Sequence, residues 1–201
     1  MLTRQFFDRD PCLVAKDLLG KVLCHRYQDA WLKAYIIETE AYYLTDKASH
    51  ASLGFTEKRK ALFMSPGTIY MYYARGGDSF NISCQGEGNA VLIKSGYPYL
   101  ADTHLQVMQS LNPKAKSLCP RPIEKLCNGQ TLLCRALGLK VTQWDQQSFD
   151  PQYIKIEDIG ESIDDIIQTT RLGIPQGRDE NLPYRFIWQS MAKYCTKKPR
   201  L

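Results

Sequence analysis

The chain has 201 residues, of which 44% are hydrophobic and 23% charged, a composition typical of an ordinary soluble globular protein. No apolar run approaches the roughly 18–20 residues that a membrane-spanning helix needs, and the acidic, proline-containing start argues against a signal peptide. We therefore expect a cytoplasmic protein, or a nuclear one in a cell that has a nucleus. The net charge of +5 and the isoelectric point near 8.8 suit a polyanion-binding surface without demanding one.

The seven cysteines form no recognisable framework. Their number is odd, no two are spaced C-x-x-C, and most lie in apolar surroundings, which favours reduced, buried thiols over disulfides or a cysteine-based zinc site. The three histidines, His25, His50 and His104, lie far apart in unrelated contexts. We expect no structural metal.

The first third of the chain predicts one helix and two strands. Asp10 is placed to cap a helix that begins at Pro11 and ends near Gly20. Residues 21–42 are typical of two strands joined by a polar turn at Gln28–Asp29. A loop with little periodicity follows and carries His50.

The middle of the chain predicts an antiparallel meander. After a turn at Pro66–Gly67, residues 69–96 contain three strands separated by glycine-rich turns at 76–77 and 86–88. Basic residues gather at 57–60 and 197–200, and such clusters are usually solvated faces.

The second half predicts helices first and strands last. Helical spacing covers 101–112 and about 122–138, with Asn128 as an N-cap, and late strands are expected at 155–160 and 184–189. No repeat or linker divides the chain, so we expect one α+β domain over residues 1–201.

The stretch AYIIETEAYY, residues 34–43, raises the question of chemistry. In a strand, Glu38, Glu40 and Tyr42 share one face, which is either a solvated face or the floor of an active site. Carboxylates two residues apart are about 6.6–7 Å from each other, as in an inverting glycosidase. These two project the same way, however, so at most one of them acts as a base.

Other segments supply partners for such a base. Tyrosines at 72 and 73 precede a glycine-rich turn through Arg75, and Asn81 and Lys94 lie on the two strands that follow. Tyrosines, a carboxylate, an amide and a basic turn are the parts needed to hold a flat heterocycle and cut a bond beside it. Each is also common in ordinary cross-strand packing.

Several segments together resemble one family. IIETEAYY, FMSPGTIYMYYARGG, NISCQGEGNAVLIK and LCNGQTLLCRALGL occur in the order found in the alkyladenine (3-methyladenine) DNA glycosylases, and the opening FFDRDPCLVAKDLLGKVL and closing RLGIPQGRDENLPYRF extend the likeness over most of the chain. The resemblance implies an α+β domain with a curved antiparallel sheet, surrounding helices and a protruding β-hairpin.

The resemblance also implies an activity. Such enzymes are monofunctional: they flip an alkylated or deaminated purine out of double-stranded DNA and hydrolyse its N-glycosidic bond, leaving an abasic site, without metal or cofactor. Glu40 matches the general base that activates water, and Leu172 matches a residue whose main-chain carbonyl helps to hold that water. Lys94 stands where familiar members have an arginine near the water.

The flipped base is expected between aromatic side chains. Tyr42 matches the residue on one side of the base, His50 and Tyr72 match those on the other, and Asn81 matches the residue that crowds the purine edge.

The residue that fills the gap left by the flipped nucleotide departs from the family pattern. Arg75 aligns with the family's tyrosine wedge, and Tyr73 is the alternative wedge.

Two other functions remain open at this point: a damaged-DNA-binding protein that has lost the reaction, and a nucleoside hydrolase. The expected partner is duplex DNA with damaged purines, the expected state a monomer.

Overall fold

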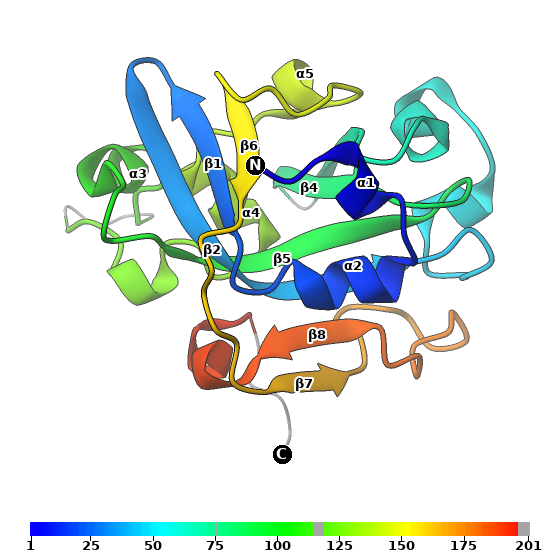
Figure 1. Ribbon diagram of the computed structural model, residues 1–201. Coiled ribbons are helices and arrows are strands. Elements are labelled where there is room, and N and C mark those ends of the chain that lie inside the picture. The colour runs from blue at the N-terminus through cyan, green and yellow to red at the C-terminus, as the bar shows by residue number, and fades with distance from the viewer. Residues whose placement is uncertain (75, 115–118, 197–201) are drawn as a thin grey trace.

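A curled antiparallel sheet organises the molecule, as the computed structural model shows (Figure 1). The structure describes residues 1–74, 76–114 and 119–196. Arg75 and the basic cluster at 197–200 therefore lie outside the described residues. The strands are β1 Val22–Tyr27, β2 Ala30–Tyr42, β3 Ile69–Ala74, β4 Gly77–Ser83, β5 Ala90–Pro98, β6 Ile154–Glu157, β7 Ile166–Thr169 and β8 Arg185–Trp188.

The long strand β2 is the centre of the sheet. The strand order is β3-β4-β5-β2-β1-β6, and β8 pairs with both β2 and β7. Because β5 runs along one edge of β2 at residues 34–42, β1 and β8 share the other edge, at residues 30–35 and 38–40. The register between β2 and β5 shifts on both sides of Glu38, a β-bulge that bends the strand there.

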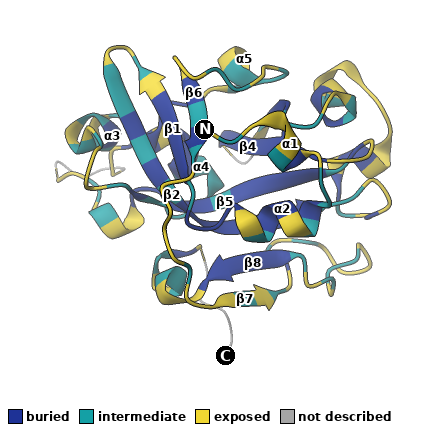
Figure 2. Cartoon of the chain, in the orientation of Figure 1, coloured by how far each residue is buried: buried dark blue, intermediate teal, exposed yellow. Residues whose placement is uncertain are grey.

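Short helices pack against the sheet. The α-helices are α1 Arg4–Phe7, α2 Pro11–Asp17, α3 Leu105–Leu111, α4 Gln130–Ala136 and α5 Val141–Trp144, and the 3₁₀ helices are η1 His50–Leu53, η2 Glu57–Phe63, η3 Ile123–Lys125 and η4 Gln189–Tyr194. Helix α2 packs against β2 and β5, and α4 against β4 and β5. Figure 2 shows β4, β5 and β8 buried along most of their length, so these strands can place polar side chains away from water.

Local sequence signals account for the elements that were predicted correctly. The Asp10 carboxylate accepts hydrogen bonds from the N–H groups of Cys12 and Leu13, which caps α2 as expected. Gln28 takes a positive φ of 54° in the tight turn between β1 and β2. The meander β3-β4-β5 and the α+β class are confirmed.

Two helix predictions were wrong in extent. The segment 101–112 is helical only at Leu105–Leu111, and 122–138 is broken into η3 and α4. Asn128 does not cap α4, because its amide donates instead to the carbonyls of Tyr194 and Cys195, at 2.8 and 2.9 Å. Gly129 occupies the N-cap position, with no side-chain cap.

Two further differences concern short elements and thiols. The edge strand β7 was not predicted, since its four residues alternate between exposed and half-buried and give little signal. Cys12, Cys24, Cys84, Cys127, Cys134 and Cys195 are free thiols, and Cys119 is exposed, contrary to the expectation of burial. Within the described residues, no helix is long and apolar enough to cross a membrane.

His25 is a buried histidine held by two hydrogen bonds. The indole Nε1–H of Trp144 donates to His25 Nε2 at 3.1 Å, so the ring proton sits on Nδ1 and is donated to the Leu137 carbonyl at 2.6 Å. Burial lowers the pKa of His25, and the bond to Leu137 opposes that shift only in part. The folded protein thus holds a neutral imidazole that links β1 to α4 and α5.

We predict that this arrangement makes stability depend on pH. Because the folded pKa lies below the unfolded value of about 6.5, the contribution of His25 is full above that pH and is lost as pH falls toward the folded pKa. His25→Leu should lower the free energy of unfolding by about 1–3 kcal/mol at pH 7.5 and by less at pH 5.5. Urea unfolding measures this, with the exposed His104→Leu as control. An identical loss at both pH values would contradict it.

Candidate active site

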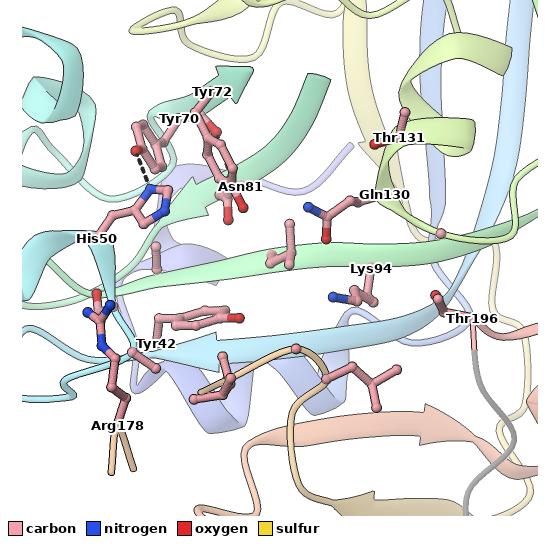
Figure 3. A pocket seen from close by; sticks show the side chains of 18 of the residues that line it. Tyr42, His50, Tyr70, Tyr72, Asn81, Lys94, Gln130, Thr131, Arg178 and Thr196 are labelled. Carbon is pink, nitrogen blue, oxygen red and sulfur yellow. Dashed lines mark hydrogen bonds between the residues drawn. The ribbon is translucent and has the colours of Figure 1, made fainter. Parts of the chain in front are cut away.

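One cavity of about 570 Å³ gathers most of the residues predicted for the site. Residues from β2, β3, β4, β5, η1, the start of α4 and the loop after β7 contribute to its lining (Figure 3). The predicted residues on its wall are Tyr42, His50, Tyr72, Asn81, Lys94 and Leu172. Positions far apart in the sequence are thus brought to one place.

Aromatic side chains face each other across this cavity. Figure 3 shows Tyr42 on one side and His50, Tyr70 and Tyr72 on the other. The rings of His50 and Tyr72 have centroids 4.4 Å apart, and His50 Nδ1 lies 2.9 Å from the Tyr70 hydroxyl. The space between the walls suits a flat molecule that stacks on aromatic faces.

His50 and Tyr70, on the wall opposite Tyr42, carry no charge near neutral pH. Burial lowers the pKa of His50, and the positive charges of Arg59 and Arg178 lower it further. Burial also raises the pKa of Tyr70 well above its usual value, so its phenol stays protonated. Tyr70 was not predicted as a site residue, although its position two before Tyr72 on a strand places both on one face.

Asn81 is fixed at the edge of the cavity by the sheet itself. It pairs with Tyr70 across β3 and β4, and its Nδ2 donates to the Tyr70 carbonyl at 3.1 Å. Only 5% of the residue is exposed, and that part lies on the cavity wall. A side chain held this way restricts the size of whatever lies against it.

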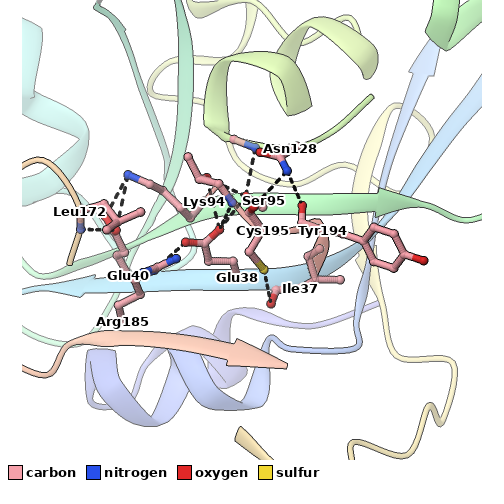
Figure 4. Close-up of polar contacts among 12 residues, drawn as sticks. Ile37, Glu38, Glu40, Lys94, Ser95, Asn128, Leu172, Arg185, Tyr194 and Cys195 are labelled. Atoms are coloured by element: carbon pink, nitrogen blue, oxygen red, sulfur yellow. Dashed lines mark hydrogen bonds and ion pairs between the residues drawn. The ribbon is translucent and has the colours of Figure 1, made fainter. Parts of the chain in front are cut away.

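Glu40 is fully buried, and Figure 4 shows Lys94 and Leu172 beside its carboxylate. Its carboxylate accepts from the Tyr42 hydroxyl at 2.8 Å and from the Leu172 N–H at 3.2 Å. Lys94 Nζ lies 3.4 Å from both carboxylate oxygens. Glu40 itself does not line the cavity, whereas all three of its partners do.

The Tyr42 hydroxyl stays protonated and donates a hydrogen bond to this carboxylate. Burial, followed by the charge of Glu40 and the hydrogen bond to it, raises the pKa of Tyr42 well above its usual value. Leu172 contacts Glu40 through its main-chain N–H. The predicted role of its carbonyl stays a prediction.

A protein-family model matches almost the whole chain. The family model described as methylpurine-DNA glycosylase matches residues 5–192. The chain belongs to this family. It is therefore a DNA glycosylase, a hydrolase that cleaves N-glycosyl bonds, with alkylated bases as its class of substrate.

Relatives extend the match over nearly the whole chain. A protein of Pseudomonas aeruginosa strain LESB58 is 62% identical over 198 residues, which cover 96% of this chain and 82% of the relative. One of Pseudomonas savastanoi pv. phaseolicola is 59% identical over 202 residues, covering 98% and 90%. One of Carboxydothermus hydrogenoformans is 36% identical over 202 residues, covering 98% and 100%. Each bears the name "Putative 3-methyladenine DNA glycosylase".

Glu38 of this methylpurine-DNA glycosylase family member is a buried, paired carboxylate. Arg185 Nε donates to its Oε1 at 2.6 Å, and the Ser95 hydroxyl to its Oε2 at 2.6 Å. Its exposed fraction is 0%, so the interpretation of this strand face as solvated was wrong. Glu38 is instead a charge-paired neighbour of Glu40.

Glu38 and Asn128 also hold the C-terminal segment, residues 194–196, beside the cavity of the glycosylase. The Thr196 N–H donates to Glu38 Oε2 at 3.3 Å, and Asn128 holds the two carbonyls before Thr196 (Figure 4). As a result Thr196 lines the cavity, together with Gln130 and Thr131 at the start of α4. Sequence reasoning missed these three residues because nothing local in the sequence indicates that the segments meet.

Of the two predicted wedge residues, the structure describes Tyr73, near the end of β3. Tyr73 is 66% exposed and pairs with Asp78 next to the turn. Arg75 lies outside the described residues, so its placement gives no basis for choosing between them.

We predict that Glu38→Gln is strongly destabilising. The substitution keeps the shape but leaves the Arg185 guanidinium buried beside a neutral side chain, which typically costs about 3–5 kcal/mol in free energy of unfolding. Glu157→Gln is the matched control, because Glu157 pairs with Lys155 at 2.7 Å but both are partly exposed, and such pairs contribute about 1 kcal/mol or less. Equal losses in chemical unfolding would contradict the prediction.

Proposed function

We propose that this glycosylase flips a damaged purine out of duplex DNA into the aromatic slot and hydrolyses its N-glycosidic bond with water activated by Glu40. The observation that carries the proposal is the buried Glu40 carboxylate, held by Tyr42, Lys94 and Leu172 at the wall of that slot. We further propose that residues 1–201 act as one catalytic domain, as a monomer, without metal or cofactor.

The slot supports recognition by stacking. Extruding a base costs a few kcal/mol for lost stacking and pairing. Stacking on Tyr42 from one side and on His50 and Tyr72 from the other returns about 1–3 kcal/mol for the flipped base. A neutral His50 does not repel an alkylated purine, which already carries a positive charge. Asn81, held at the edge of the cavity, would crowd a purine that bears an additional exocyclic amino group.

The chemistry needs a base beside the sugar. The water oxygen forms a bond to C1′ as the bond from C1′ to the purine nitrogen breaks, and the water proton passes to Glu40. An alkylated purine leaves as a neutral molecule because the bonding electrons cancel its positive charge. The negative charge of Glu40 also stabilises the oxocarbenium-like sugar. The product is an abasic site.

Lys94 takes the place of the arginine expected from the family. Its ammonium lies 3.4 Å from both Glu40 oxygens and lines the cavity, so it can pair with the carboxylate and donate to the water. A lysine is a point charge on a flexible stem and lacks the planar fork of arginine. For the gap left by the flipped nucleotide, the candidates are Tyr73, exposed on the hairpin, and Arg75.

The first test measures base release. Duplexes with a single 7-methylguanine or hypoxanthine are incubated with wild type and Glu40→Gln, and abasic sites are counted. Wild type should release at least one base, and Glu40→Gln should be slower by about 10²–10⁴-fold, the contribution of a positioned general base. Glu157→Gln, which alters a partly exposed carboxylate of β6, should keep the wild-type rate. Wild-type rates for Glu40→Gln would refute the assignment of the base.

A second test determines whether the nucleophile is water or an amine of the protein. Since Glu40 activates water, no Schiff base forms, and borohydride added during the reaction should trap no protein–DNA adduct. An adduct mapped to Lys94, which lies on the cavity wall, would show instead that this enzyme is a lyase.

A further inference from the structure

Arg171 is a buried cation directly behind the slot that the mechanism above does not use. Its side chain has 0% exposure, and its guanidinium forms an ion pair with Asp46. It also donates from Nη1 to the Ala41 carbonyl at 3.1 Å and from Nη2 to the Asp179 carbonyl at 3.4 Å. One side chain thus links the end of β2 to two loops.

The guanidinium also lies over the ring of Tyr42. The distance from Arg171 Cζ to the ring centroid is 4.6 Å, within the range of a cation–π contact. Tyr42 lines the cavity and Arg171 does not, so the arginine supports the ring from the face turned away from the slot. With its hydroxyl bound to Glu40, the ring is held at two points.

Asp46 links Arg171 to the opposite wall of the slot. Its Oδ1 accepts from the Ala48 N–H at 2.8 Å, and its carbonyl accepts from the Ser49 N–H at 2.8 Å. These bonds form the turn that leads into His50, whose ring faces the slot. The ion pair between Arg171 and Asp46 therefore connects the side of the slot formed by Tyr42 to the side formed by His50.

Arg171 is also the residue next to Leu172, whose N–H binds Glu40. In addition, no hydrogen-bond partner for Arg171 Nε is found among the described residues, although that atom is buried. A buried, incompletely satisfied arginine is costly for stability and is expected where it serves a site.

We propose that Arg171, through Asp46, is a positioning residue that sets the separation and orientation of the two walls on which the flipped purine stacks. The inference rests on the proposed function and adds a residue that contacts neither the base nor the water. A neutral ring of fixed orientation presents its face to the purine, so loosening this support should weaken stacking in the flipped state more than binding to the duplex.

The test compares Arg171→Lys with wild type on a duplex that contains etheno-adenine, whose emission reports how the base is stacked. Lysine keeps the charge beside Asp46 but loses the planar group on Tyr42 and the fork of donors. The bound base should show altered emission, and the single-turnover rate of 7-methylguanine release at saturating enzyme should fall about tenfold. The dissociation constant for the duplex should change by less than about twofold.

Arg9→Lys is the matched control. Arg9 also pairs with a carboxylate, Asp17, and also lies over an aromatic ring, Phe6, at 4.5 Å, but it takes no part in the cavity. For Arg9→Lys, the emission of the bound base and the single-turnover rate of base release should equal those of wild type. Asp46→Asn should reproduce the effect of Arg171→Lys, and the double variant should be no worse than either, because both act through one contact.

The outcomes separate this inference from the proposed function. If wild type itself releases no base, the proposed function fails. If wild type is active and both Arg171→Lys and Asp46→Asn keep the wild-type emission and saturating rate, the positioning role is refuted. A lower rate explained by a smaller folded fraction, with unchanged emission of the bound base, refutes it too. If Arg171→Lys does not fold, Asp46→Asn decides by the same two readouts.

Discussion

Two carboxylates buried side by side on β2 are the constraint on which the rest of the site depends. Glu38 and Glu40 both have 0% exposure, and a buried carboxylate is tolerated only when it is paired and hydrogen-bonded. The sheet supplies the pairs: β8 joins β2 at residues 38–40 and brings Arg185 to Glu38, while β5 brings Lys94 to Glu40. Strand β8, late in the chain, thus supplies the charge partner for a carboxylate on the second strand.

The two ion pairs are built differently, and this difference fits the different roles that we propose for the two carboxylates. Glu38 receives the Arg185 guanidinium at 2.6 Å and the Ser95 hydroxyl at 2.6 Å, so its oxygens are occupied by structural donors. Glu40 is met by a lysine at 3.4 Å, and that lysine lies on the cavity wall. The two short bonds hold Glu38 in place, and the Thr196 N–H donates to it over a longer distance of 3.3 Å. The longer contact leaves Glu40 beside a flexible cation, which suits the role in activating water that we propose for Glu40.

What the sequence could and could not predict follows the range of the interactions involved. The Asp10 cap, the turn at Gln28 and the three-strand meander depend on residues a few positions apart, and these were predicted. The role of Asn128 depends on carbonyls more than sixty positions away, which turns an expected helix cap into an anchor for the C-terminal segment. Arg171 likewise has no local signature, because its partner Asp46 lies on a distant loop.

The same pairing explains how a slot surrounded by basic residues suits a cationic base. Arg171 lies behind Tyr42 but is neutralised by Asp46, Lys94 is matched by Glu40, and burial keeps His50 uncharged. These three groups therefore add little net charge to the aromatic walls, and the remaining cation on the described cavity lining is Arg178. Under the proposed mechanism, alkylated and neutral purines stack comparably and are distinguished at the bond to C1′, where a purine that already carries positive charge leaves more readily.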